Sequence, residues 1–141
     1  MAINVGQRHI SDTVSTKMCY AVDKCQHLCS YVLCITKNKK VLENPQADLA
    51  WRVRAIALDI HSLVSVANRI DTRTEDEEQI TARLENQKAA YYKLLEMLSL
   101  IPVVSAAYGW RSKRRRYWTE LVESAINLVK AWHTADKNKF N

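Results

Sequence analysis

Apolar residues recur at alternating steps of four and three through four long segments of this chain. The first segment shows the rhythm at Val14, Met18, Ala21, Cys25, Leu28, Val32 and Ile35. Spacing of this kind places apolar side chains on one face of an α-helix. The other three segments cover about residues 45–70, 75–101 and 112–136. Only two glycines and two prolines occur in 141 residues, so we expect long helices joined by short connections.

Four amphipathic helices with short links predict an all-α fold, an antiparallel up-down four-helix bundle. The seven-residue repeat of the apolar stripes favours near-parallel helix packing. We expect residues 11–136 to form this domain, with a flexible arm at residues 1–10 and a basic tail at residues 137–141. No segment is typical of a strand long enough to build a sheet.

Local signals mark the expected helix boundaries. Asn44 before Pro45 is typical of a helix N-terminus. Residues Thr74–Glu77 have the pattern of a capping box, with acids in the first turn. Pro102 is expected to kink or end the third helix, and Gly109 to close that segment.

The stripe of the third helix contains one polar side chain, Gln87. The stripe consists of Ile80, Leu84, Gln87, Tyr91, Leu94, Leu98 and Ile101. Gln87 either specifies the register of the helix or marks a shift of the stripe toward Ala90.

Five cations lie within six positions where the fourth helix begins. They are Arg111, Lys113, Arg114, Arg115 and Arg116. Positive charge at a helix N-terminus opposes the helix dipole, and each exposed cation costs about 0.3–1 kcal/mol. The third helix begins with acids instead, as stability favours. This contrast indicates that the basic run serves a function.

Antiparallel packing brings further cations to the same end of the bundle. They come from the end of the first helix and the start of the second: Lys37, Lys39, Lys40, Arg52 and Arg54. Residues 71–85 carry a local charge of −4, so the rest of the chain carries +10. We expect the acidic segment to lie at the opposite end, near Arg69 and Arg73.

A basic cluster with nearby tryptophan and tyrosine is typical of contact with RNA or DNA. Cations neutralise phosphates and release counterions, and aromatic rings stack on unpaired bases. Two alternatives remain for the cluster. It is either a collar that is solvated or paired with acids of a neighbouring subunit, or a surface that binds an acidic protein partner.

The cysteines and histidines do not form a recognisable chemical site. The cysteines, all on the first helix, are Cys19, Cys25, Cys29 and Cys34. They lack the CxxC spacing of a zinc site, so we expect thiols packed in the core. The histidines, His9, His27, His61 and His133, are scattered. We therefore predict no catalytic residues, no cofactor, no metal and no enzymatic activity.

Other features bear on location and assembly. We find no apolar run of 18 residues and no signal-peptide core, and expect a cytoplasmic protein without membrane contact. Trp51 lies off the stripe of its helix, and the adjacent Tyr91 and Tyr92 cannot share one face. Aromatic surface left outside the core favours a homo-oligomer.

Two segments resemble a known family. They are the run Ala50–Leu58, with alternating arginines, and the basic segment Arg111–Arg116 before an aliphatic last helix. Over about residues 11–136 the chain resembles the four-helix-bundle family that includes proteins encoded within ribosomal-RNA intervening sequences. That family also includes the accessory variability determinant proteins of diversity-generating retroelements, which are encoded by bacteria and phages.

The resemblance implies a specific role. Accessory variability proteins are non-catalytic pentamers with a basic surface that binds nucleic acid and a reverse transcriptase during copying of a template RNA. The implied function is a nucleic-acid-binding accessory subunit of a reverse transcriptase in a retroelement complex. The basic residues named above would contact RNA or DNA, and the aromatics outside the stripes would serve assembly.

Overall fold

The computed structural model describes the backbone of residues 9–140 and the side chains of residues 20–140. Within this range the chain forms five helices and no strand, which confirms the prediction of an all-α fold. The helices are α1 (His9–Thr36), α2 (Lys39–Leu42), α3 (Ala47–Arg69), α4 (Glu77–Ala107) and α5 (Ser112–Phe140). Residues 1–8 of the expected flexible arm lie outside the described residues.

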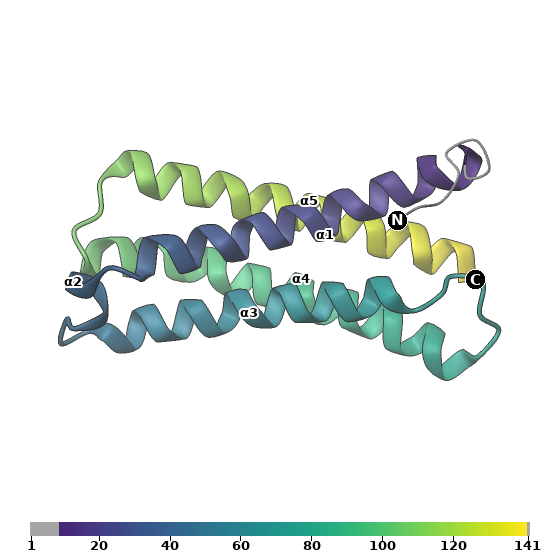
Figure 1. Cartoon of the computed structure of the whole chain (residues 1–141), viewed down its shortest axis with the longest axis horizontal. Coiled ribbons are helices and arrows are strands. Elements are labelled where there is room, and N and C mark those ends of the chain that lie inside the picture. The colour runs from purple at the N-terminus through teal and green to yellow at the C-terminus, as the bar shows by residue number, and fades with distance from the viewer. Residues whose placement is uncertain (1–8, 141) are drawn as a thin grey trace.

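The four long helices lie side by side, and their successive connections lie at alternate ends (Figure 1). α1 packs against α3 and α5, α4 packs against the same two helices, and the short α2 packs against α3. This bundle-like arrangement brings the end of α1, the start of α3, the end of α4 and the start of α5 to one end of the molecule (Figure 1).

Apolar side chains from all four long helices meet in one core. Its fully buried members include Leu28, Val32, Val53, Ile56, Ile60, Leu94, Met97, Trp118, Val122 and Val129. Burying one aliphatic side chain of this size stabilises the fold by about 1.5–3 kcal/mol. The steps of three and four in the sequence therefore arise from this shared core.

The buried stripe of α4 is centred one residue earlier than the sequence predicts. Arg83, Ala90 and Met97 are buried, whereas their neighbours Leu84, Tyr91 and Leu98 are half-buried at its edge. The stripe passes through the buried Gln87 and shifts to Ala90, which was one of the two expected alternatives. The small Ala90 and the flexible Met97 occupy the centre of the helix interface, and the bulkier side chains lie beside it.

The helices α3 and α4 begin later than the sequence predicts. α3 begins at Ala47, and Asn44 instead accepts a 2.8 Å hydrogen bond from the Gln46 amide in the preceding turn. α4 begins at Glu77, with Asp76 as the N-cap residue that accepts from the Glu78 amide at 2.9 Å. The predicted capping roles of Asn44 and of Thr74 are therefore wrong, because each stabilises the turn before the helix.

α4 continues through Pro102 and ends at a glycine. Proline has no N–H to donate to the carbonyl four residues earlier. Because Pro102 is exposed, that carbonyl lies on the solvent side of the helix. Gly109 has a φ of 63°, and its amide donates to the Ala106 carbonyl at 3.3 Å. The Trp110 amide donates to the Ser105 carbonyl at 2.9 Å. These two bonds form a Schellman motif, which confirms that Gly109 closes the segment.

α5 extends through part of the predicted basic tail. The helix runs to Phe140 and carries Lys137 and Lys139 in its last turn. Cations at a helix C-terminus interact favourably with the helix dipole, which accounts for the extra turn.

α4 is also apolar enough to raise the question of a membrane. It contains an 18-residue window with a mean hydropathy of 1.2, of which 33% is buried. By length and composition alone such a helix could span a bilayer. A core helix meets the same criterion, and the buried stripe of α4 packs against α3 and α5. The absence of membrane contact stays a prediction.

A buried polar network joins α3, α4 and α5 at the end of the bundle opposite the basic run. Arg83 Nε donates to Asp136 Oδ2 at 2.5 Å, and both side chains are no more than 2% exposed. Arg83 Nη1 donates to the carbonyls of Ala67 and Ile70 at 3.0 and 2.8 Å. Gln87 Nε2 donates to the same carboxylate oxygen at 2.7 Å. Arg83 thus donates to two carbonyls at the end of α3, of which that of Ala67 also accepts from the Ile70 amide at 3.2 Å.

His133 adds a titratable group to this network. Its Nδ1 lies 3.2 Å from Gln87 Oε1. Burial is the main cause that lowers the pKa of His133, and Lys137 and Lys88 lower it further, while Asp136 and Glu85 oppose the shift. The unfolded chain therefore binds a proton at a higher pH than the folded chain does.

We expect His133 to make the fold less stable in weak acid. Its contribution is complete above the ordinary histidine pKa of about 6.5 and is lost as the pH falls toward the lowered pKa of the folded state. His133→Gln should flatten the pH dependence of the urea midpoint in this window relative to the wild type. His27→Gln, which changes an exposed histidine, serves as the control. Identical pH profiles for the wild type and His133→Gln would contradict this expectation.

Candidate nucleic-acid interface

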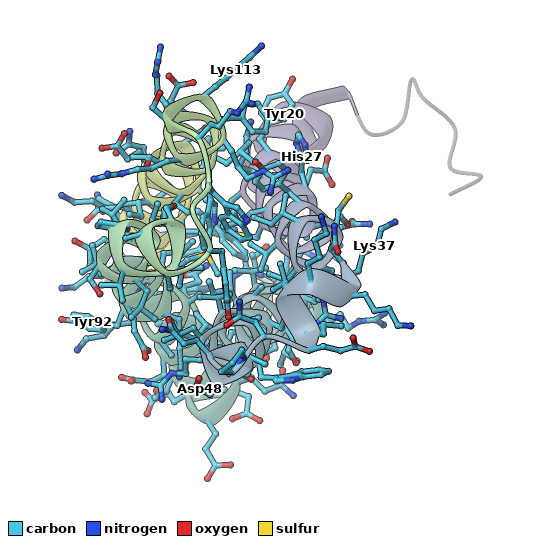
Figure 2. The ribbon with its side chains drawn as sticks, turned by 90° about the vertical axis from the view of Figure 1, so that its left-hand side faces the viewer. Tyr20, His27, Lys37, Asp48, Tyr92 and Lys113 are labelled. Atoms are coloured by element: carbon cyan, nitrogen blue, oxygen red, sulfur yellow. The ribbon has the colours of Figure 1, made fainter. Side chains whose placement is uncertain are left out.

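The cations of two predicted groups gather at one end of the molecule. This basic end consists of Lys37, Lys39, Lys40, Arg111, Lys113, Arg114, Arg115 and Arg116, all of them exposed. Among the side chains of residues 20–140, none of these eight forms an ion pair with an acid. In Figure 2 this end faces the viewer. Lys113 on α5 lies at the top, Lys37 just after α1 lies at the right, and Asp48 on α3 lies at the bottom. The positive charge therefore lies over the α1 and α5 half of the end.

The turn between α1 and α2 positions the lysines. α1 ends at Thr36, whose hydroxyl donates to the Val32 carbonyl at 2.6 Å. Asn38 then caps α2 and accepts from the Lys40 amide at 2.8 Å. This capped corner places Lys37 and Lys40 at a hollow that Trp110 and Arg114 also line.

The aromatic residue before α5 anchors the arginine run. Trp110 follows the Schellman motif and packs edge-on against the fully buried Trp118, with ring centroids 6.0 Å apart. Its ring also contacts Tyr108 at 5.4 Å. The Arg114 guanidinium lies over Trp110, 5.1 Å from the ring centroid. Arg114 is therefore held by a cation–π contact against an aromatic side chain that is itself tied to the core.

Two hollows open at the basic end and share one wall. The tyrosine hollow, of about 500 Å³, is lined by Tyr31, Trp110, Arg111, Lys113, Arg114 and Tyr117, with Gly109 at its edge. The lysine hollow, of about 620 Å³, is lined by residues that include Cys34, Lys37, Asn38, Lys40 and Tyr108. Trp110 and Arg114 line both hollows. Arg115 and Arg116 line neither of them.

Two predicted binding residues, Arg52 and Arg54, have other partners. Arg52 forms an exposed ion pair with Glu96 of α4, and this bond is the largest cause that lowers the pKa of Glu96. Arg54 donates to the Leu33 carbonyl at 3.1 Å and to Thr36 Oγ1 at 2.7 Å. Arg54 thus satisfies groups at the end of α1, and neither arginine lines a hollow. The structure gives both side chains helix-to-helix contacts.

The acidic segment lies at the connection between α3 and α4, at the opposite end of the molecule (Figure 1). Asp71 there forms an exposed ion pair with Arg73 at 3.1 Å, and the hydrogen bond from Arg73 lowers the pKa of Asp71. The two ends of the molecule therefore differ in charge as the sequence predicts.

The cysteines fit the expected packing in part. Cys25 and Cys29 are buried thiols in the core, and burial raises the pKa of Cys25 to about 12. Cys34 is an exposed thiol at the lysine hollow, so core packing is wrong for this residue. The Cys19 side chain lies outside the described residues. Over the searched part of the chain, no three His, Cys, Asp or Glu side chains gather to hold a metal ion.

The hollows combine aromatic residues beside the predicted basic run with residues that the sequence did not single out. Trp110 and Tyr117 flank the basic run, as the sequence shows, and the spacing of Tyr117 from Lys113 and Arg114 places these three side chains on the same side of α5. Tyr31 and Asn38 come from α1 and the turn after it. Steps of three and four from Trp110 to Tyr117 could have indicated the α5 face, but no local signal connects it to Tyr31.

Comparison with protein-family models, with curated proteins and with solved structures found no match to this chain. The resemblance to retroelement accessory proteins therefore stays a prediction. The function has to be inferred from the geometry of the basic end.

Proposed function

We propose that this chain is a non-catalytic nucleic-acid-binding protein, an antiparallel up-down four-helix bundle whose basic end contacts RNA or DNA. One observation supports this proposal above the others. Eight exposed cations without acid partners among the described side chains lie at the basic end, and five of them line two hollows that share Trp110 and Arg114. Phosphates would take the place of the missing acids, and release of their counterions would drive binding.

The start of α5 supports a functional origin for this charge. α4 begins with Glu77 and Glu78 in its first turn, as the helix dipole favours. The first turn of α5 contains no acid and begins within the arginine run. A sequence selected for stability alone would replace these cations, because they repel one another and oppose the dipole.

The wider role implied by the resemblance is part of the proposal. It comprises an accessory subunit of a reverse transcriptase and template RNA, a homo-oligomer that is pentameric if the resemblance holds, and a cytoplasmic location. Trp51 and Tyr92 are 56% and 57% exposed, which supports an assembly surface on the outer faces of α3 and α4. The partnership with a reverse transcriptase rests on the resemblance alone.

We expect Arg114→Ala, Arg115→Ala and Arg116→Ala together to abolish tight RNA binding while the fold is retained or slightly stabilised. Wild-type affinity for a single-stranded RNA should fall steeply with salt, and the triple variant should reduce the slope by about two units, as the loss of three phosphate contacts implies. Fluorescence anisotropy at several salt concentrations measures the slope, and circular dichroism measures the fold.

A matched control removes the same charge elsewhere. Arg69, Lys88 and Lys130 are exposed and lie outside the basic end, so their triple alanine variant should keep most of the affinity and the slope. Equal losses in both triple variants would show that net charge, and no particular surface, binds RNA. Unfolding of the Arg114–Arg116 variant would show that the basic run stabilises the fold, and would contradict its proposed role in binding. A native protein indifferent to RNA at low salt would favour the acidic protein partner instead.

A further inference from the structure

The tyrosine hollow combines an accessible aromatic ring with adjacent cations. Tyr117 is 44% exposed, and its ring meets that of Tyr31 edge-to-face, with centroids 5.0 Å apart and planes at 65°. An edge-to-face contact covers at most one face of the Tyr117 ring. The other face is left for a planar ligand.

The cations of the hollow lie on the same side of α5 as this ring. Lys113 and Arg114 precede Tyr117 by four and three residues, so their side chains are its neighbours on the helix. Arg114 lies over Trp110 and also close to Tyr31. Burial raises the pKa of the Tyr31 hydroxyl, and the charge of Arg114 opposes this rise. The guanidinium is thus positioned before any ligand arrives, which lowers the entropy lost on binding.

We infer that the tyrosine hollow binds one unpaired base stacked on Tyr117, with the neighbouring phosphates on Arg111, Lys113 and Arg114, so that the chain prefers single-stranded nucleic acid. This inference rests on the proposed function. A volume of about 500 Å³ is within the range of about 300–1,000 Å³ typical of small-ligand sites. A base in a duplex is stacked on both faces and cannot enter the hollow, whereas an unpaired base can.

The arginine run thereby divides into two parts. Arg111, Lys113 and Arg114 line the tyrosine hollow, whereas Arg115 and Arg116, which are also exposed, do not line it. The second pair can contact phosphates of either a single strand or a duplex. Base-dependent affinity should therefore depend on Tyr117, and base-independent affinity on Arg115 and Arg116.

The test compares three probes at one salt concentration by fluorescence anisotropy. The probes are an oligouridylate of about ten nucleotides, an abasic strand of equal length, and an RNA duplex. The wild type should bind the oligouridylate about tenfold tighter than the abasic strand, as stacking of one base on an aromatic ring implies. Tyr117→Ala should remove this preference, so that the oligouridylate binds no more tightly than the abasic strand. Arg115→Ala with Arg116→Ala should weaken binding of all three probes by a similar factor and keep the preference.

The outcomes separate this inference from the proposed function. Equal wild-type affinity for the oligouridylate and the abasic strand, or tighter binding of the duplex, would overturn the base site and leave nucleic-acid binding intact. Failure to bind any probe at low salt would overturn both. Tyr117→Leu keeps apolar bulk without an aromatic face, so it should lose the preference as Tyr117→Ala does. A preference retained in Tyr117→Leu would show that packing, and not stacking, is responsible.

Discussion

Arg83→Met is expected to lower the free energy of unfolding by about 3–5 kcal/mol. The substitution leaves the carboxylate of Asp136 buried, charged and without its cation, since both side chains are no more than 2% exposed. It also removes the donor to the carbonyls of Ala67 and Ile70 at the end of α3. The free energy of unfolding of a domain is typically about 5–15 kcal/mol, so this single change would remove a large part of it. Urea denaturation followed by circular dichroism measures the loss.

Two further variants make this prediction specific to the buried pair. Arg52→Met breaks an exposed ion pair with Glu96 and should cost no more than about 1 kcal/mol. Arg83→Met with Asp136→Leu replaces both charges by apolar side chains and should recover at least half of the loss, because no unpaired charge remains. Equal effects of Arg83→Met and Arg52→Met, or a double variant no more stable than Arg83→Met, would show that the pair does not hold the three helices together.

The sequence predicts the helical fold well because the core depends on a repeated pattern. Each long helix has apolar residues at helical spacing, and the four stripes meet in one core that includes Leu28, Ile56, Leu94 and Val129. The pattern fails where a side chain is buried for a reason other than hydrophobicity. Arg83 carries a charge, and its partner Asp136 lies on another helix, so a local pattern places both on the surface.

Helix ends are less predictable because several side chains compete for the same amides. Asn44 and Thr74 are suitable capping residues, yet each accepts from an amide two residues later, within a turn. α3 and α4 therefore begin after these turns, at Ala47 and Glu77. The choice depends on where the helix meets the core, which the local sequence does not contain.

The candidate site could be predicted in position but only partly in composition. Alternation of helix direction brings Lys37–Lys40 and Arg111–Arg116 to one end, and this requires only the order of the helices. The roles of Arg52 and Arg54 depend on contacts with Glu96 and Thr36 from other helices. Tyr31 joins the hollow for the same reason. Such pairings are set by rotation of each helix about its axis, which is fixed only when the core is packed.

Trp118→Ala is expected to lower the free energy of unfolding by about 3–5 kcal/mol. Trp118 is the largest fully buried side chain among the described residues, so its removal leaves a cavity that the surrounding helices can fill only in part. Trp51→Ala is the matched control. Trp51 is 56% exposed and lies beneath the Arg54 guanidinium, 5.4 Å from its ring centroid. Losing this contact should cost about 0.5–1 kcal/mol.

The Trp118 variant should also weaken the proposed base site, because Trp110 packs on Trp118 with ring centroids 6.0 Å apart. Loss of this support would release Trp110, which forms one wall of the tyrosine hollow that encloses the base, and with it the Arg114 guanidinium that its ring holds. At a temperature where Trp118→Ala remains folded, its preference for the oligouridylate over the abasic strand should therefore fall, whereas Trp51→Ala should keep the wild-type preference. Trp118→Phe retains an aromatic contact and should lie between the two. A Trp118→Ala protein that is less stable yet keeps the full preference would show that the hollow forms independently of the core beneath it.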